Sequence, residues 1–338
     1  MTAQNGAAVL LDCTLRDGSY AIGFQFTSRD TQNLVSGLAK AGLAMIEVGH
    51  GLGLGASGTS HGIAFENDRA YIAAAKKVAG DAKIGAFFIP GIGCLDDMTA
   101  ARDAGLDFIR VGSNVDRAHV AAKAVEKARA LGLVVHLNLM KVYAVTPDEL
   151  AKIAAPCRDW GLDCIYAVDS AGCMLPGQVA RYVNVLKETC AIPVGFHGHN
   201  NLDLANANCL AALDAGARYV DATLRGMGRS SGNAQTEVLA YLMRQAGYEV
   251  NVDPFVLFGV IENHLQPLMV TQQGQSSLDV VIGMSKFHSA FLARFRRALD
   301  TYDVDLLRLI NEVSRIDCVD PQPDLIDRIA RDMSRRDV

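Results

Sequence analysis

The sequence lacks the features of three large classes of protein. No apolar run in its 338 residues is long enough to cross a membrane, and residues 1–5 carry no basic group that would begin a signal peptide. The formal net charge of −5 argues against nucleic acid or an anionic membrane as the main partner. The eight cysteines form no CxxC pair and mostly stand among apolar residues, so we expect reduced core cysteines in a cytoplasmic protein.

What the sequence contains instead is one pattern that repeats up to about residue 250. A short apolar run is followed by a polar or glycine-containing tip and then by an alanine-rich amphipathic stretch that often ends on glycine, as helices do. One of these helices is predicted to begin with a capping box made by Thr146 and Glu149, with Pro147 at the first helical position. The pattern predicts these strands: Val9–Asp17, Met45–His50, Ile84–Pro90, Phe108–Ser113, Val134–Met140, Cys164–Ser170, Val194–His199 and Tyr219–Leu224.

Eight strand–helix units within about 250 residues predict an α/β fold of the (β/α)8 TIM-barrel type. The rival is a doubly wound open sheet, which normally has fewer strands, and the absence of a nucleotide-type GxGxxG after the first strand weakens it. Beyond residue 250 the sequence shows helical stretches and no further strand. We therefore expect a barrel domain over residues 1–250, which holds the active site, and a C-terminal α-helical domain over residues 251–338.

A barrel with an enzymatic role should carry polar residues at the C-terminal ends of its strands, because the chemistry of this fold is located there. Most of the predicted strands do carry or precede such residues. A purely structural barrel would not need this concentration of charge at its mouth, although any one member could be a capping or supporting residue. The residues are Arg16, Asp17, Glu47, His50, His136, Asn138, Asp169, Ser170, His197, His199 and Arg225.

The segment GFHGHNN, residues 195–201, places two histidines two positions apart. Because side chains alternate along a strand, His197 and His199 project from the same face and can share one metal ion. The alternative is that they hydrogen-bond neighbours in a polar layer. Asp17 is the natural third ligand, and this set leaves open positions for a chelating 2-oxo acid. We expect Mn²⁺ first, with Mg²⁺, Co²⁺, Zn²⁺ or ferrous iron as alternatives.

Arg16 immediately precedes the expected ligand Asp17. Its guanidinium group presents fixed hydrogen-bond donors, so it is the candidate for stabilising the oxygen of an enolate. The alternative is an ion pair with Glu47 or Asp169, and the two roles are compatible with each other.

The stretch that follows the eighth predicted strand is rich in glycine. Asn233, in the segment SSGNAQTEVL, is expected to be the N-cap of the eighth helix. Gly226, Gly228 and Gly232 could build a small anion-holding loop, because barrels often bind phosphate near this strand. That signal is weak here.

Four segments together resemble one group of proteins. They are LLDCTLRDGSY (residues 10–20), IEVGHGLGLGASG (46–58), YAVDSAGCM (166–174) and the stretch 195–234, which runs from GFHGHNN to GMGRSSGNA. They resemble the pyruvate-forming 4-hydroxy-2-oxovalerate aldolases, within a superfamily of metal-dependent barrel lyases and Claisen synthases that includes HMG-CoA lyase and isopropylmalate synthase. The TLRDG and HGHNN motifs are specific to the superfamily. The GHGLGLGASG loop and the helical tail narrow the match to the aldolases, and the resemblance covers nearly the whole chain.

The resemblance implies a role for each of five residues. Asp17, His197 and His199 would bind a divalent metal, Arg16 would stabilise the pyruvate enolate, and Ser170 would touch the substrate carboxylate; His197 is also expected to contact substrate. The implied reaction is the class II retro-aldol cleavage of a 4-hydroxy-2-oxo acid to pyruvate and an aldehyde, or the reverse condensation. The expected partners are these small molecules, further copies of the chain in a homo-oligomer, and an acylating aldehyde dehydrogenase that takes up the aldehyde. Neither nucleic acid nor a membrane is expected.

One position departs from the aldolases. After TLRDGS they carry a histidine that serves as the acid–base on the 4-hydroxyl group, whereas this sequence has Tyr20. An unperturbed tyrosine, with a pKa near 10, is a poor base at neutral pH. In the tail segment KFHSAFL, His288 stands where the aldolases carry a tyrosine. We therefore expect Tyr20 and His288 to have exchanged roles as catalytic residues; the alternative is that His288 is an ordinary surface or core histidine.

Two other functions remain open from the sequence. One is a Claisen-type synthase or lyase of the same superfamily that joins an acyl thioester to a 2-oxo acid, although the short helical tail speaks against the regulatory region of such synthases. The other is a catalytically silent barrel that acts as a binding subunit. The intact Arg16, Asp17, His197 and His199 argue against it, and Tyr20 keeps it under consideration.

Overall fold

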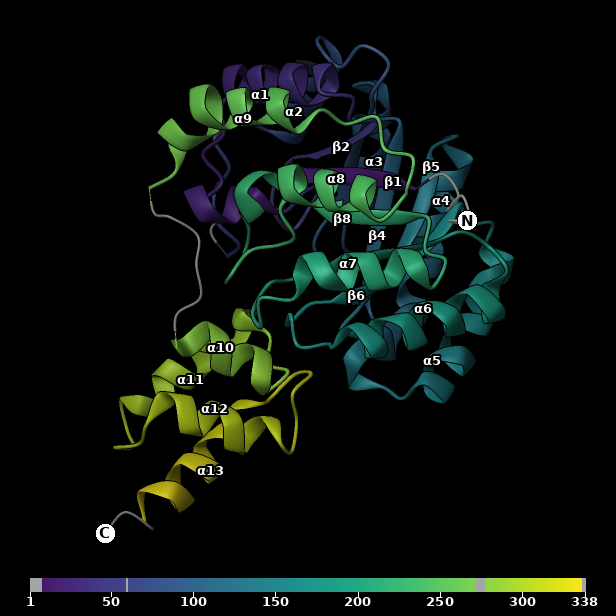
Figure 1. The fold of residues 1–338 in the computed structure, drawn as a ribbon. Helices are drawn as coiled ribbons and strands as arrows, with labels where there is room; N and C mark the ends of the chain where they lie inside the picture. The colour runs from purple at the N-terminus through teal and green to yellow at the C-terminus, as the bar shows by residue number, and fades with distance from the viewer. Residues whose placement is uncertain (1–7, 59, 271–276, 336–338) are drawn as a thin grey trace.

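The structure, a computed structural model, describes residues 8–58, 60–270 and 277–335 (Figure 1). Residues 1–5, expected to carry no signal peptide, lie outside these ranges. Parallel strands close into a barrel in sequence order, and the first strand pairs with both the second and the eighth. This confirms the predicted (β/α)8 barrel. The strands are β1 (Val9–Leu15), β2 (Met45–Val48), β3 (Lys83–Phe88), β4 (Phe108–Asn114), β5 (Val134–Met140), β6 (Cys164–Asp169), β7 (Val194–Gly198) and β8 (Tyr219–Ala222).

A helix follows each strand of the barrel (Figure 1). The fifth begins as predicted, because the Thr146 hydroxyl accepts from the Glu149 N–H and the Glu149 carboxylate accepts from the Thr146 N–H at 2.7 Å. The helices are α1 (Ser28–Lys40), α2 (Asp68–Lys76), α3 (Leu95–Asp103), α4 (Ala122–Ala130), α5 (Pro147–Ala154), α6 (Pro176–Cys190), α7 (Ala205–Asp214) and α8 (Thr236–Gln245).

Several strands end earlier than the sequence predicts. The first was expected to run to Asp17, but β1 ends at Leu15. The N–H groups of Arg16 and Asp17 both donate to the carbonyl oxygen of Cys13, at 3.0 and 2.8 Å, so the chain turns there instead of continuing the ladder. Because of this turn, the Arg16 and Asp17 side chains need not point to opposite faces, as successive side chains of a strand do.

The tail begins with α9 (Pro254–Val260), which packs against α1 and α8 and adds Leu257 to the core around the barrel. The remaining helices gather around a second apolar cluster that includes Phe287 and Phe295, to one side of the barrel (Figure 1). They are α10 (Ser277–Met284), α11 (Leu292–Leu299), α12 (Leu306–Ser314) and α13 (Pro323–Ser334). In the described part of the chain, none of the helices combines the length and the apolarity that a membrane span requires. A domain boundary at residue 250 stays a prediction.

Candidate active site at the barrel mouth

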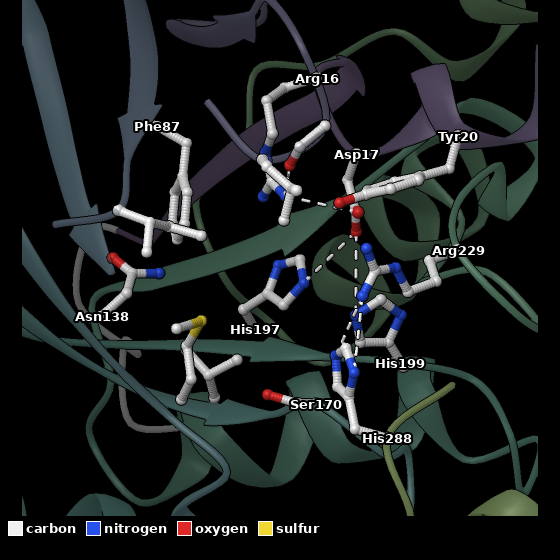
Figure 2. Close-up of a pocket in the computed structure, with 15 residues that line it drawn as sticks. Arg16, Asp17, Tyr20, Phe87, Asn138, Ser170, His197, His199, Arg229 and His288 are labelled. Carbon is white, nitrogen blue, oxygen red and sulfur yellow. Dashed lines mark hydrogen bonds and ion pairs between the residues drawn. The ribbon is translucent and has the colours of Figure 1, made fainter. Parts of the chain in front are cut away.

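A pocket opens at the C-terminal ends of the strands, and the tail residue His288 closes part of it (Figure 2). It contains about 480 Å³ of empty space, including the part open to solvent. Every residue predicted as catalytic, substrate-binding or metal-binding lines this pocket, although the sequence places these residues at the ends of three strands and in the tail. These residues are Arg16, Asp17, Tyr20, Ser170, His197, His199 and His288.

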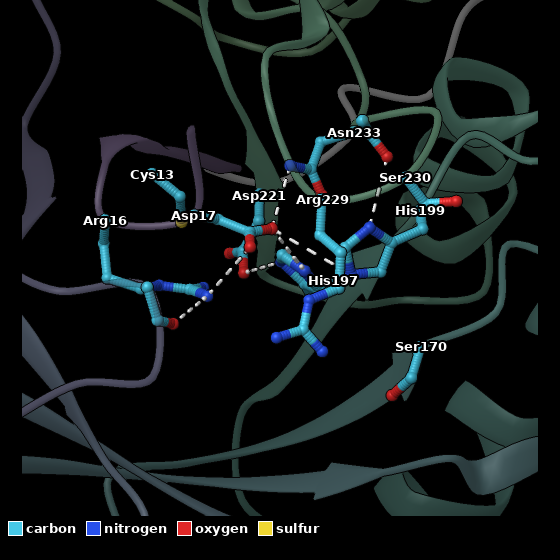
Figure 3. A network of polar contacts seen from close by, with 12 residues as sticks. Cys13, Arg16, Asp17, Ser170, His197, His199, Asp221, Arg229, Ser230 and Asn233 are labelled. Atoms are coloured by element: carbon cyan, nitrogen blue, oxygen red, sulfur yellow. Dashed lines mark hydrogen bonds and ion pairs between the residues drawn. The ribbon is translucent and has the colours of Figure 1, made fainter. Parts of the chain in front are cut away.

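Asp17, His197 and His199 each offer one ligand atom, and these atoms lie within 4.8 Å of one another. The Nε2 atoms of His197 and His199 lie 3.5 and 3.9 Å from Asp17 Oδ2. Each histidine uses Nδ1 elsewhere: His197 contacts Asp221 Oδ2 at 2.9 Å, and His199 contacts the Gly232 carbonyl oxygen at 3.2 Å (Figure 3). Metal-binding histidines typically hold Nδ1 in this way while Nε2 faces the ion. The three residues therefore fit a divalent metal.

The charge states of Asp17, His197 and His199 also fit a metal site. Burial opposes ionisation of Asp17, but Arg16 and the two histidines outweigh burial and hold the pKa of this carboxyl well below its usual range. Burial lowers the pKa of His199 to about 4, so its ring is neutral at pH 7. Burial also acts to lower the pKa of His197, but the carboxylates of Asp17 and Asp221 outweigh burial and raise it. Metal binding needs an ionised carboxylate and unprotonated ring nitrogens. The carboxylates of Asp17 and Asp221 favour a proton on His197, and a bound metal ion would replace that proton.

A second group with metal-ligand chemistry lies nearby and shares His197 with the first. It consists of Cys13, His197 and Asp221. Arg110 already pairs with Asp221, and burial raises the pKa of the Cys13 thiol well above its usual value. Because the thiolate and not the thiol binds metals, this group is a poor site. Within the described residues, Asp17, His197 and His199 are the better ligand set.

Beneath these ligands a chain of buried charges crosses the barrel. We call it the pocket floor: Arg16, Glu47, Arg110, Asp221 and His197. Arg16 Nε lies 2.8 Å from Glu47 Oε2, and Arg110 Nη1 lies 3.1 Å from the same oxygen. Arg110 also pairs with Asp221, which holds His197. No side chain of the pocket floor is more than 7% exposed, so the network fixes Arg16 at one end and His197 at the other.

The structure decides between the ion-pair partners considered for Arg16. The pair with Glu47 is present, and Arg16 Nη1 also lies 3.4 Å from Asp17 Oδ1. Its guanidinium group lies over the Phe87 ring, 4.8 Å from the centroid. Asp169 is not a partner, because its carboxylate accepts N–H groups of the loop that follows β6. The sequence analysis did not single out Arg110 and Asp221; their only signal is a charge at an alternate position within the apolar runs FIRV and YVDA.

The prediction that all these polar residues lie at the mouth was partly wrong, because five of them do not line the pocket: Glu47, His50, His136, Asp169 and Arg225. His136 lies deeper in the barrel, stacked between Phe108 and Tyr166, and neither ring nitrogen has a hydrogen-bond partner among the described residues. His50 is held in the loop after β2, where its Nε2 lies 3.2 Å from the Gly62 carbonyl oxygen. Arg225 is exposed to solvent. Alternation along a strand predicted which side chains face inward, but not how deep they lie.

Asn233 is not the N-cap of the eighth helix, because α8 begins only at Thr236. Instead, Asn233 Nδ2 donates to Asp17 Oδ2 at 2.9 Å (Figure 3). In the same loop, the Gly232 carbonyl oxygen accepts from the ring of His199, and the Gly232 N–H donates to a backbone carbonyl. The loop after β8 thus positions two of the three candidate metal ligands.

Three further residues line the pocket, and we call them the pocket roof: Tyr20, Arg229 and His288 (Figure 2). The Arg229 guanidinium lies 4.2 Å from the centroid of the Tyr20 ring, and its Nη1 lies 3.5 and 3.3 Å from Nδ1 and Nε2 of His288. His288 Nδ1 also accepts from the Ala290 N–H at 3.2 Å. Burial, aided by Arg229, lowers the pKa of His288 well below its usual value, whereas burial raises the pKa of Tyr20. At pH 7 the roof is a neutral phenol and a neutral imidazole with an arginine between them.

Ser170 lies on the wall of the pocket, where its hydroxyl oxygen accepts from the Lys141 N–H at 3.2 Å. Arg229 was not predicted from the sequence. Its signal is a single arginine in the glycine- and serine-rich segment GMGRSSGN, which follows the eighth strand.

Comparison with known proteins points to one family. The model of the HMGL-like family matches residues 7–261. The chain is 36% identical over 326 residues to a 4-hydroxy-2-oxovalerate aldolase of Carboxydothermus hydrogenoformans, covering 96% of this chain and 97% of the relative. It is 38% identical over 325 residues to a protein of the same name from Geobacillus genomosp. 3, covering 96% of each.

Solved structures share the fold. The N-terminal domain of a putative aldolase from Bacteroides vulgatus superposes with a TM-score of 0.74 at 24% identity, covering 85% of this chain and 96% of that one. The carboxyl transferase domain of Rhizobium etli pyruvate carboxylase, determined with pyruvate, superposes with a TM-score of 0.75 at 16% identity, covering 98% and 61%. At these low sequence identities, the superpositions show a shared fold and nothing about function.

Proposed function

The chain belongs to the HMGL-like family and, within it, to the 4-hydroxy-2-oxovalerate aldolases, and we propose that it is a divalent-metal-dependent class II aldolase acting on a 4-hydroxy-2-oxo acid. As a carbon–carbon lyase it breaks the bond between C3 and C4 to give pyruvate and an aldehyde, or forms that bond in the reverse direction. A Claisen-type reaction and a silent barrel are not favoured, because the curated relatives that match nearly the full chain are named aldolases.

The observation that carries this proposal is the convergence of Asp17, His197, His199 and Arg16 in one pocket. A divalent ion held by the first three would supply a Lewis acid for the keto oxygen of the 2-oxo acid. Arg16 is already held by Glu47 at 2.8 Å, so its remaining donors need little reorganisation to stabilise the negative charge of an enolate. The wall around His197 and Ser170 is proposed to contact the keto-acid end of the substrate.

Proton transfer at the 4-hydroxyl group is assigned to the pocket roof. When the C3–C4 bond breaks, this hydroxyl loses its proton as C4 becomes a carbonyl carbon. His288 has a lowered pKa and is therefore unprotonated at pH 7, which leaves it able to accept a proton. Protonation of Nδ1 would displace the 3.2 Å contact from the Ala290 N–H and the 3.5 Å contact with Arg229 Nη1. The Tyr20 phenol, whose pKa is raised by burial, would orient the hydroxyl group or relay the proton.

Several finer features belong to the same proposal. Mn²⁺ is the metal we expect, because two imidazoles and one carboxylate leave room for oxygen ligands from substrate and water; Mg²⁺, Co²⁺ and Zn²⁺ are the alternatives. We also propose a cytoplasmic homo-oligomer that releases its aldehyde to an acylating aldehyde dehydrogenase.

The decisive experiment incubates the purified protein, reconstituted with Mn²⁺, with pyruvate in deuterated water. Proton NMR should show exchange of the methyl protons, which reports enolisation without any need for the second substrate. A coupled assay for pyruvate then tests cleavage of 4-hydroxy-2-oxovalerate. An Asp17→Asn variant and a chelated sample serve as controls that should show neither. Absence of exchange and cleavage in the metal-loaded protein would overturn the proposed function.

A further inference from the structure

Arg229 stands out because its positive charge has no acidic partner in the part of the chain that the structure describes. Its guanidinium contacts the Tyr20 ring and the His288 ring, which are both neutral at pH 7. No carboxylate of the described residues lies within ion-pair distance of it, whereas the other arginine of the pocket, Arg16, is held by Glu47 at 2.8 Å. The side chain is partly exposed, so it is reached from the pocket.

The position of this charge indicates which part of a substrate would meet it. If the metal ligands and Ser170 take the keto-acid end, the 4-hydroxyl group faces Tyr20 and His288. The substituent that C4 carries beyond this hydroxyl then lies beside Arg229, which sits between these two residues (Figure 2). Phe87 and Asn138 line the pocket away from Arg229 (Figure 2). A neutral alkyl group has no need of a cation in this place.

We propose that Arg229 binds a carboxylate on the aldehyde half of the substrate, so that the natural substrate is a 4-hydroxy-2-oxo dicarboxylic acid. A guanidinium group matches a carboxylate with two parallel hydrogen bonds. This proposal rests on the aldolase function proposed above and specifies its substrate class. In the cleavage, the C3–C4 bond breaks, its electron pair stays on C3 as the pyruvate enolate, and the 4-hydroxyl proton passes to the base. The product that leaves with C4 is an oxo acid instead of a neutral aldehyde.

Two substrates of equal chain length separate this role from any general role of Arg229 in catalysis. 4-Hydroxy-2-oxoglutarate carries a carboxylate at C5, where 4-hydroxy-2-oxovalerate carries a methyl group. We expect the wild-type protein to favour the dicarboxylic acid by about 10- to 100-fold in kcat/KM, the range typical of a charge-assisted pair of hydrogen bonds. In Arg229→Gln this ratio should fall to about one. Arg225→Gln, which removes an exposed arginine of the same loop, should keep the wild-type ratio.

A binding measurement tests the same contact without turnover. 2-Oxoglutarate and 2-oxovalerate lack the 4-hydroxyl group and cannot be cleaved in this way. Calorimetric titration should show tighter binding of 2-oxoglutarate to the wild-type protein, and Arg229→Gln should lose this difference while Arg225→Gln keeps it. Because the readout is affinity, it decides the role of Arg229 even if the protein fails to enolise pyruvate, which would count against the aldolase function itself.

Three results would overturn the proposal. The first is a wild-type protein that cleaves or binds the monocarboxylic member of each pair equally well or better. The second is an Arg229→Gln variant that loses the same factor with both substrates, which would restrict Arg229 to tuning the acid–base pair. The third is a clear preference for a 4-hydroxy-2-oxo acid with a terminal phosphate over the dicarboxylic acid, because the bound anion would then not be a carboxylate.

Discussion

The floor and the roof of the pocket differ in how their charges are balanced. In the floor, Arg16, Glu47, Arg110, Asp221 and His197 form one buried chain in which each charge meets an opposite one within the barrel. In the roof, an arginine lies between a phenol and an imidazole and meets no carboxylate of the described residues. The floor is thus complete without a substrate, while the roof carries a charge that a substrate can satisfy.

The difference matches the two halves of the proposed reaction. Forming an enolate from a 2-oxo acid requires fixed donors whose reorganisation would be costly, and buried paired charges provide them. Selecting the aldehyde half of the substrate requires contacts whose residues can change without disturbing the enolate chemistry. The 3-10 turn η1 (Gly18–Ile22), the loop after β8 and the tail supply those contacts here, and all three lie outside the strands.

The largest effect should follow from removing a metal ligand. Asp17→Asn replaces a carboxylate that faces both histidines. We expect metal affinity to fall by at least about 100-fold, which exceeds the usual effect of replacing a residue that only hydrogen-bonds a ligand. His199→Ala should do the same. Elemental analysis after dialysis measures the bound metal, with His119→Ala, an exposed histidine, as the control. Unchanged metal content in both ligand variants would exclude the site.

Arg16→Ala tests whether the floor contributes chemistry beyond holding the metal ligands. We expect a loss of pyruvate proton exchange of about 10²- to 10³-fold, the effect of removing one donor to a developing oxyanion. Metal content should stay near the wild-type level, since Arg16 is not a ligand. Equal exchange rates in the variant and the wild type would remove Arg16 from the mechanism.

Arg110→Met tests the floor as a structural unit. The substitution leaves Glu47 and Asp221 buried without their shared cation, so we expect the free energy of unfolding to fall by about 3–5 kcal/mol. Urea titrations followed by circular dichroism measure it. The exposed pair of Arg158 and Asp159 is the matched comparison, because Arg158→Met removes a solvent-screened ion pair and should change stability far less. Similar losses in the two variants would show that the floor is not a coupled network.

His288→Ala addresses the roof. We expect cleavage to slow by about 10²-fold or more, the usual contribution of an acid–base group, while metal content is unchanged. The double exchange Tyr20→His with His288→Tyr, which restores the arrangement expected of the aldolases, should recover more cleavage than Tyr20→His alone. Full activity in His288→Ala would assign the base to another residue.

The barrel and its metal ligands could be predicted because their signals are local. Strand alternation, glycine-ended helices and the GFHGHNN segment each depend on a few neighbouring residues. The pairing of Arg110 with Glu47 and Asp221 depends on how β4 faces β2 and β8 across the closed barrel, which no single stretch of sequence encodes. The position of Arg229 between Tyr20 and His288 depends in addition on where the tail packs.

His136 shows the limit of such local signals, since it was expected at the mouth and lies within the packed interior. It is fully buried, and burial lowers its pKa to about 3, compared with about 6.5 in an unfolded chain. Between these two values the unfolded chain binds a proton that the folded protein excludes. The free energy of unfolding should therefore decrease as the pH falls below 6.5, and this single group should account for about 2 kcal/mol at pH 5.

His136→Phe removes this dependence while keeping an aromatic ring between Phe108 and Tyr166. Between pH 7.5 and pH 5, the variant should lose about 2 kcal/mol less of its free energy of unfolding than the wild type does. Urea titrations at both pH values measure the difference, and His119→Gln should behave as the wild type because His119 is exposed. Equal losses in His136→Phe and the wild type would mean that the folded protein accommodates a charged His136, as a residue of the open mouth would. The smaller loss would instead assign His136 to the neutral aromatic packing with Phe108 and Tyr166 inside the barrel.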